Sequence, residues 1–267
     1  MKKILYTISI ITTALLVSCS QEFTDTDNLY EKSFENYYSR PQDIDEASGG
    51  IYSALYMPDI YSDEAVTANL LSDFVLGGGG PDDRGAKNVD GFQDPEEDTY
   101  KDLWVITYNG IYRCNAVIEN LEGADFSEYF LTDVEAKQYV DQAMAEAYFM
   151  RGFFYFRAAK FFGGMPIIPS TQADRNVPRS SYSDTYAQIA SDFKTAIELF
   201  PSKPFSSIPT ERYGHANKWV AQAYMARAYL YYTGYMTNME GQATSELPLP
   251  EGGAISKGQV VAYLEDC

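Results

Sequence analysis

The stretch from Asp133 to Phe162 limits what this chain can fold into more than any other part of the sequence. Its only helix-breaking residue is Gly152, and apolar side chains recur along it at steps of three or four, the spacing of one buried face of an α-helix. These side chains are Val140, Ala143, Ala147, Met150, Phe154, Ala158 and Phe161. At ~1.5 Å per residue the segment forms about 45 Å of helix, which is longer than a small domain is wide. We therefore predict one long helix at the centre of the fold, against which other helices pack.

A second, largely aromatic stripe runs beside the first along the same helix. It comprises Met144, Tyr148, Arg151, Tyr155, Ala159 and Phe162. Because the helix is then apolar around much of its circumference, it must be covered on more than one side. Gly163 and Gly164, followed by Pro166, are expected to end it, since Gly favours a left-handed cap and Pro cannot continue a helix.

Other segments show helical spacing and are expected to pack against this long helix. They cover residues 39–57, 100–121, 181–200, 216–232 and 256–266. Ser39 is expected to cap the first of them and Pro58 to end it. Residues 59–74 are assigned a short helix, and residues 76–99, which are rich in Gly and Asp, a long polar loop.

The composition of residues 216–232 indicates closely packed helix pairs. Small and large side chains alternate there, an arrangement that lets helices approach each other closely. Ala187-Gln188 also recurs as Ala221-Gln222, at the ~34-residue period of tetratricopeptide units. The predicted fold class is therefore all-α, a tetratricopeptide-like helical repeat scaffold with long loops.

The first residues have the features of an exported lipoprotein. Residues 1–18 read as a signal peptide, because two lysines precede a short apolar run that ends at Leu16. Leu16-Val17-Ser18-Cys19 matches the bacterial lipobox, in which the Cys is acylated and becomes the new N-terminus. We predict lipidation at Cys19, a tether over residues 19–38 and a helical domain over residues 39–267; the alternative is an ordinary signal peptide with a chance Cys. Acylation at Cys19 anchors a protein to a membrane without crossing it, and Ser20 is compatible with outer-membrane sorting.

Charge and residue inventory argue against several classes of function. The formal net charge of −18 disfavours nucleic-acid binding. The single His, His215, disfavours a His-based triad or a His-rich metal site. The glycines at 77–80 lack the Lys-Ser/Thr ending of a phosphate loop. The three Cys do not form a disulfide framework, and Cys114 is expected to be a buried thiol. We predict no metal and no cofactor, although Ca²⁺ binding by the acidic loop stays open beside the favoured solvated loop.

Candidate ligand-binding residues lie around the long loop. Sugars bind to the faces of aromatic rings and to amide or carboxylate groups that accept or donate to hydroxyls. On this basis we select Asp73, Phe92, Tyr100 and Trp104. A place for Trp104 in the protein core is an equally good interpretation.

At this point the chain resembles the SusD/RagB family of outer-membrane nutrient-binding lipoproteins. The resemblance rests on the lipobox Cys, the segment from Trp104 to Ile118, the block from Glu146 to Pro166, and the two helical segments that follow. The hallmark positions of the central block are Glu146, Arg151, Arg157, Gly163, Gly164 and Pro166. The resemblance implies a tetratricopeptide-type scaffold whose loops carry the ligand surface. It also implies that the chain covers only the N-terminal part of such a protein and is incomplete at its C-terminal end.

The resemblance further implies a function and a location. Family members are lipid-anchored at the surface of the outer membrane of Gram-negative bacteria. They cap a SusC-type TonB-dependent transporter and deliver oligosaccharides to it without chemistry of their own. Two alternatives stay open: a helical-repeat interaction protein that serves only as a transporter lid or binds peptides, and a glycosidase that uses paired carboxylates such as Glu96 and Glu97.

The charged hallmark residues can also be interpreted without the family. Glu146 and Arg151 lie about 140° apart around the helix, and Arg157 lies about three turns beyond Glu146, so neither arginine bridges easily to that glutamate. An unpaired charge among aromatic side chains is costly. We therefore expect Arg151 to contact a carboxylate or helix-end carbonyls of a neighbouring helix, and the hallmark to be mainly structural.

Overall fold

The computed structural model describes residues 37–56, 64–72, 74–80, 84–92, 100–174, 176–203 and 205–267. Its contacts divide the chain into two units, Met1–Ser39 and Arg40–Cys267, and the description below concerns the second. The predicted signal peptide, Cys19 and most of the tether lie outside the described residues. So does Asp73.

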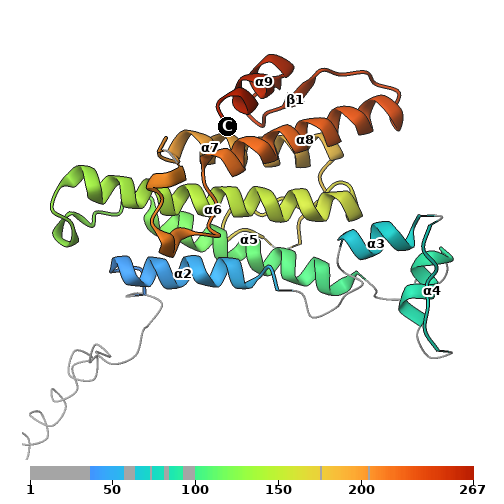
Figure 1. The fold of residues 1–267 in the computed structure, drawn as a ribbon, viewed down its shortest axis with the longest axis horizontal. Helices are drawn as coiled ribbons and strands as arrows, with labels where there is room; N and C mark the ends of the chain where they lie inside the picture. Colours follow the sequence, from blue (N-terminus) through green and yellow to red (C-terminus); the bar gives the residue numbers. More distant parts are fainter. Residues whose placement is uncertain are drawn as a thin grey trace, which may run out of the picture. The chain divides into compact units, whose positions relative to one another are not determined.

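The second unit is built almost wholly from helices (Figure 1). The α-helices are α2 (Pro41–Ser53), α3 (Glu64–Leu70), α4 (Arg84–Asp90), α5 (Lys101–Leu121), α6 (Asp133–Phe162), α7 (Tyr182–Leu199), α8 (Lys218–Asn238) and α9 (Lys257–Glu265). Short 3-10 turns cover η3 (Ser127–Tyr129), η4 (Phe205–Ser207) and η5 (Thr210–Arg212), and two short strands are β1 (Glu246–Pro248) and β2 (Ala254–Ser256). The prediction of a helical, tetratricopeptide-like scaffold is confirmed. No helix among the described residues combines the length and apolar character needed to cross a membrane.

Helix α6 has the predicted bounds and lies at the centre of the helical stack (Figure 1). The Thr132 side chain accepts a hydrogen bond from the backbone N–H of Glu135, which caps its start, and Gly163 ends it at a φ of +72°. Helices α5 and α7 both pack along α6, while α2 contacts α5 and α6. Each later helix packs on the one before it, α8 on α7 and α9 on α8. Helix α6 is therefore covered by other helices on more than one side, as its two apolar stripes predicted.

Two glycines set how closely the central helices approach each other. A Cβ added at Gly152 of α6 lies 2.9 Å from the Phe193 ring and 3.0 Å from the Asp192 Cβ of α7. A Cβ added at Gly110 of α5 lies 2.5 Å from the Phe154 ring of α6. The one Gly in the long helix is therefore explained by packing, since it admits an aromatic ring of α7 against the backbone of α6.

The structure corrects several sequence-based boundaries. Arg40, not Ser39, is the N-cap of α2, where its backbone N–H donates to the Asp43 carboxylate, and the helix ends at Ser53, before Pro58. Helix α8 continues to Asn238, beyond the predicted end at residue 232. The assignment of residues 76–99 to a loop is wrong for residues 84–90, which form α4.

Helix α4 and the β1–β2 hairpin both depend on tertiary partners. Leu70 of α3 and Ala86 and Val89 of α4 form a small buried cluster, so that each short helix provides the apolar surface for the other. In the hairpin, Leu247 pairs with Ile255 and both side chains are fully buried. Neither element is long enough to show a clear periodicity, because short helices and strands gain most of their stability from what they pack against.

Candidate functional site

Arg151 of α6 is the centre of a buried polar network that joins three helices. Its Nε and Nη2 donate to Oδ2 and Oδ1 of Asp192 on α7 at 3.1 and 2.7 Å, and its Nη1 donates to Oδ1 of Asn115 on α5 at 2.8 Å. Gln188 Nε2 donates to the same Asp192 carboxylate at 3.0 Å. Burial lowers the pKa of Arg151, but the Asp192 carboxylate raises it by more, so the net pKa lies above its ordinary value. The expected carboxylate partner on a neighbouring helix is confirmed.

Glu146, one and a half turns before Arg151, is the centre of a second network. Its side chain is 2% exposed, and its Oε2 lies 2.8 Å from Nδ1 of His215. The hydroxyl of Tyr52 on α2 and Nη1 of Arg212 on η5 each donate to the carboxylate at 3.4 Å. The segment that precedes α8 is thereby tied to α2 and α6. Arg151 pairs with Asp192, while Glu146 pairs with Arg212 and His215, so the two hallmark charges have separate partners, as the spacing along the helix predicted.

An aromatic cavity of about 430 Å³ opens beside α5. We define it by its lining residues, which are Trp104, Tyr108, Asn109, Tyr112, Pro166 and Ile168. Trp104 is held between Tyr108 and Phe162, with ring centroids 4.9 and 5.2 Å apart. Tyr112 is 40% exposed. The cavity thus combines a fixed indole, a phenol ring that is open to solvent and one side-chain amide, which are groups that stack on sugar rings and hydrogen-bond to their hydroxyls.

The wall opposite α5 is fixed by hydrogen bonds from three helix side chains. The Tyr108 hydroxyl donates to the Pro166 carbonyl at 2.8 Å, and Asn115 Nδ2 donates to the Ile168 carbonyl at 2.9 Å. The Ile168 backbone N–H donates to the Tyr155 hydroxyl at 2.8 Å. Because Asn115 also accepts from Arg151, the buried hallmark network continues into the wall of the aromatic cavity.

The C-terminal hallmark residues shape the turn into this wall. A Cβ added at Gly164 overlaps the Ser180 carbonyl oxygen, so only Gly allows the chain to pass there. Pro166 lines the aromatic cavity itself. Arg157 is half-buried on α6. Gly164 and Pro166 thus determine the path of the backbone that forms one wall of the aromatic cavity.

The structure separates the four candidate ligand-binding residues. Trp104 lines the aromatic cavity. Tyr100 precedes α5, and its ring lies 5.5 Å from that of Phe161 and packs against the α3–α4 cluster. Phe92 is 81% exposed, with a φ of +50° just after α4. Asp73 lies outside the described residues. Of the three candidates that the structure describes, Trp104 alone lines this cavity.

Sequence reasoning missed the partners of Trp104. Tyr108, Asn109 and Tyr112 line the cavity beside Trp104, and none of them is among the four residues selected from the sequence. The four-residue spacing of Trp104, Tyr108 and Tyr112 places three aromatic side chains on one face of α5, and this signal was available. The contribution of Pro166 and Ile168, which come from beyond the next helix, was not.

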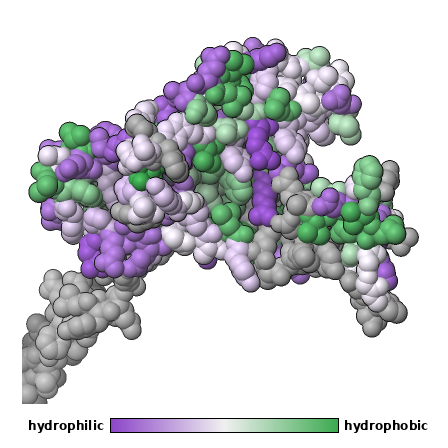
Figure 2. Space-filling model, in the orientation of Figure 1, coloured by the Kyte–Doolittle hydropathy of each residue, from purple (hydrophilic) through white to green (hydrophobic). Residues whose placement is uncertain are grey.

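Exposed apolar side chains gather on the α3–α4 segment (Figure 2). They are Leu71, Phe74, Val75, Leu76 and Phe92. Phe92 therefore belongs to an exposed apolar surface and not to the aromatic cavity.

Most acidic residues of the 76–99 segment lie outside the described residues, including Glu96 and Glu97. Asp90 is described, and its carboxylate accepts a hydrogen bond from the Gly77 backbone N–H at 3.0 Å. Within the described ranges, no three His, Cys, Asp or Glu side chains come together as a potential metal site. Cys114 is fully buried, as expected, and its burial raises the pKa of its thiol.

A family model described as "Starch-binding associating with outer membrane" matches residues 22–230 of this chain. The chain belongs to this SusD-like family. SusD-like protein P2 of Formosa agariphila is 26% identical over 204 residues, which are 73% of this chain and 37% of that protein. The resemblance inferred from the sequence is therefore confirmed.

Solved structures show the same fold. A SusD homolog from Bacteroides thetaiotaomicron matches with a TM-score of 0.64 and 22% identity, over 78% of this chain and 39% of that one. Surface glycan-binding protein A from Bacteroides fluxus matches with a TM-score of 0.60 and 22% identity, over 73% of this chain and 41% of that one. This SusD-like chain thus spans well under half the length of these relatives.

Proposed function

We propose that this SusD-like protein binds glycans at the bacterial cell surface through the aromatic cavity on α5. The observation that carries the proposal is the cavity itself, in which Trp104 and Tyr112 present aromatic faces and Asn109 presents an amide. Its volume of about 430 Å³ lies within the range of ~300–1,000 Å³ that is usual for small-ligand sites. The hydrogen-bonded wall at Pro166 and Ile168 supports the proposal, because a fixed wall reduces the ordering cost of binding.

The protein delivers its ligand to a SusC-type TonB-dependent transporter and catalyses no reaction. Family membership and the lipobox support this part of the proposal. Acylation of Cys19 holds the protein at the outer membrane, on its outer face, beside the transporter. Co-purification of a TonB-dependent barrel with the lipidated protein in detergent tests the partnership; absence of any barrel from the purified complex contradicts it.

Tyr112 offers the cleanest test of the ligand site. It is 40% exposed, so Tyr112→Ala removes a stacking face with little effect on packing. We expect affinity electrophoresis on a panel of neutral glycans to show retardation of the native protein. Tyr112→Ala is expected to weaken binding by about 1–2 kcal/mol, roughly five- to thirtyfold.

The control is Tyr56→Ala, which removes a ring that is 79% exposed and does not line the cavity. Retardation that Tyr56→Ala and Tyr112→Ala reduce equally contradicts a site in the aromatic cavity. A folded native protein that no glycan retards favours the interaction protein or a peptide binder. Release of reducing sugar that depends on one carboxylate identifies a glycosidase instead.

A further inference from the structure

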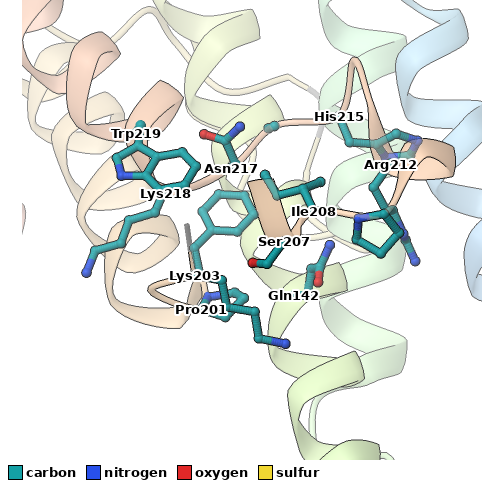
Figure 3. A pocket seen from close by; sticks show the side chains of 13 residues that line it. Gln142, Pro201, Lys203, Ser207, Ile208, Arg212, His215, Asn217, Lys218 and Trp219 are labelled. Atoms are coloured by element: carbon teal, nitrogen blue, oxygen red, sulfur yellow. The ribbon is translucent and has the colours of Figure 1, made fainter. Parts of the chain in front are cut away.

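A second cavity, of about 200 Å³, lies where the chain passes from α7 to α8 (Figure 3). It shares no lining residue with the aromatic cavity. Phe200, Pro201, Ile208 and Trp219 provide apolar wall, and Gln142 reaches it from α6. This cavity is therefore a separate, partly apolar site on the helical scaffold.

The charged side chains that line this cavity are basic, whereas the chain as a whole is acidic. The sequence contains 38 Asp and Glu against 20 Lys and Arg, for a formal net charge of −18. The described lining nevertheless includes Lys203, Arg212 and Lys218, together with His215, and no Asp or Glu. We call it the cationic cavity. A local excess of basic groups in an acidic protein favours an anionic ligand.

Two of these basic groups are already engaged by carboxylates behind the cavity. The guanidinium of Arg212 forms ion pairs with Asp45 at 3.0 Å and with Glu146 at 3.4 Å. His215 is bound to the same Glu146. Both side chains therefore serve the network around Glu146, and they leave little charge for a ligand.

The two lysines remain available. Lys218 Nζ donates to the Ser202 hydroxyl at 2.6 Å and lies 3.8 Å from Asp266, whose side chain is 58% exposed. An ion pair of that length to an exposed partner contributes little. Lys203 Nζ has no acceptor among the described residues, and its side chain is exposed. Both ammonium groups thus retain donor capacity for an anion.

Uncharged side chains around the cavity can orient a bound ligand. The Asn217 Oδ1 accepts from the Val220 backbone N–H at 3.1 Å, which orients the amide and leaves its Nδ2 as a donor. Figure 3 shows Asn217, Ile208, Ser207 and Gln142 around the cavity, with the basic side chains towards its edge. A ligand that fits carries an anionic group at one end and a compact body that packs on Trp219 and Ile208.

We propose that the cationic cavity binds a small carboxylate ligand, with Lys203 and Lys218 supplying the positive charge at its edge. The carboxylate belongs either to an acidic sugar or to a free organic acid. Isothermal titration calorimetry at low salt with glucuronate, succinate and glucose distinguishes the sources. We expect at least one acid to bind and glucose to bind at least tenfold more weakly. Tighter binding of glucuronate assigns an acidic sugar, whereas equal or tighter binding of succinate assigns an organic acid.

Substitutions locate this binding. Lys203→Gln removes an exposed charge without a described partner, so the fold is preserved, and we expect the affinity for the acid to fall about tenfold. Combining it with Lys218→Gln is expected to abolish detectable binding. Lys257→Gln on α9 makes the same change of charge outside the cavity and is expected to leave the affinity unchanged.

Three results overturn the proposal: no heat with either acid, equal binding of glucose, or unchanged acid binding in the folded double variant. Tyr112→Ala separates this site from the aromatic cavity. This variant is expected to leave acid binding unchanged. The two proposed sites can therefore be tested independently, and one proposal can fail while the other holds.

Discussion

The contribution of a single residue to stability depends here on which buried polar groups would lose their partner if that residue were removed. Arg151 neutralises the buried Asp192 and satisfies Asn115, and all three side chains lie in the interior. Breaking a buried ion pair is costly because the remaining charge stays desolvated. We therefore expect the main role of Arg151 to be structural.

Arg151→Ala is expected to lower the free energy of unfolding by about 3–5 kcal/mol, because it leaves the Asp192 carboxylate buried and unpaired. Denaturant unfolding followed by circular dichroism measures this change. Glycan affinity below the melting transition is expected to change little, since Arg151 does not line the aromatic cavity.

The matched control for this variant is Lys137→Ala on the same helix. Lys137 pairs with Asp141, but its side chain is 72% exposed, so its loss is expected to cost less than about 1 kcal/mol. Equal stability of Arg151→Ala and the native protein refutes the structural role.

At the scale of elements, helices α6 and α7 approach each other closely because Gly152 has no side chain. Gly152 lies mid-helix, where Gly is ordinarily unfavourable by about 1 kcal/mol relative to Ala. The Phe193 ring occupies the space that a Cβ requires. Close approach of the two helices therefore outweighs helix propensity at this position.

Gly152→Ala is expected to destabilise the protein by about 1–3 kcal/mol, since overpacking outweighs the gain in propensity. Gly234→Ala, in α8, is the control, because no atom lies within 4 Å of an added Cβ there. This second variant is expected to be neutral or more stable by up to about 1 kcal/mol. Thermal unfolding of both variants decides the matter, and stabilisation by Gly152→Ala contradicts a packing role.

For the whole molecule, the scaffold presents two cavities of different chemistry. The aromatic cavity is lined by uncharged residues of α5 and the 166–168 segment, whereas the cationic cavity is lined by the connection between α7 and α8. Both depend on α6, whose Arg151 and Glu146 networks hold the neighbouring segments. Attachment to a membrane is expected to come from the chain before this scaffold.

Cys19→Ala is expected to abolish metabolic labelling with palmitate and to move the protein from the membrane fraction to the soluble fraction, because the lipobox assigns the acyl chains to this cysteine. Cys267→Ala removes an exposed thiol and serves as the control, which is expected to keep label and location. Persistent labelling of Cys19→Ala contradicts the lipobox assignment.

The sequence by itself was sufficient for the helical scaffold and for the family. Helix α6 begins and ends at the predicted residues, and α7 falls within the predicted helical segment 181–200. This is because helical periodicity is local: residues three and four apart share a face whatever the rest of the chain does. The need for a partner of Arg151 followed from the cost of burying a charge.

Tertiary structure alone decided which residues meet. The pairing of Arg151 with Asp192, the wall of the aromatic cavity at Ile168 and the grouping of Lys203 with Lys218 join segments from different elements. Helix α4 and the β1–β2 hairpin were missed because their stability comes from packing partners and not from their own periodicity. Periodicity places a side chain on a face, but only the packing of helices determines what that face contacts.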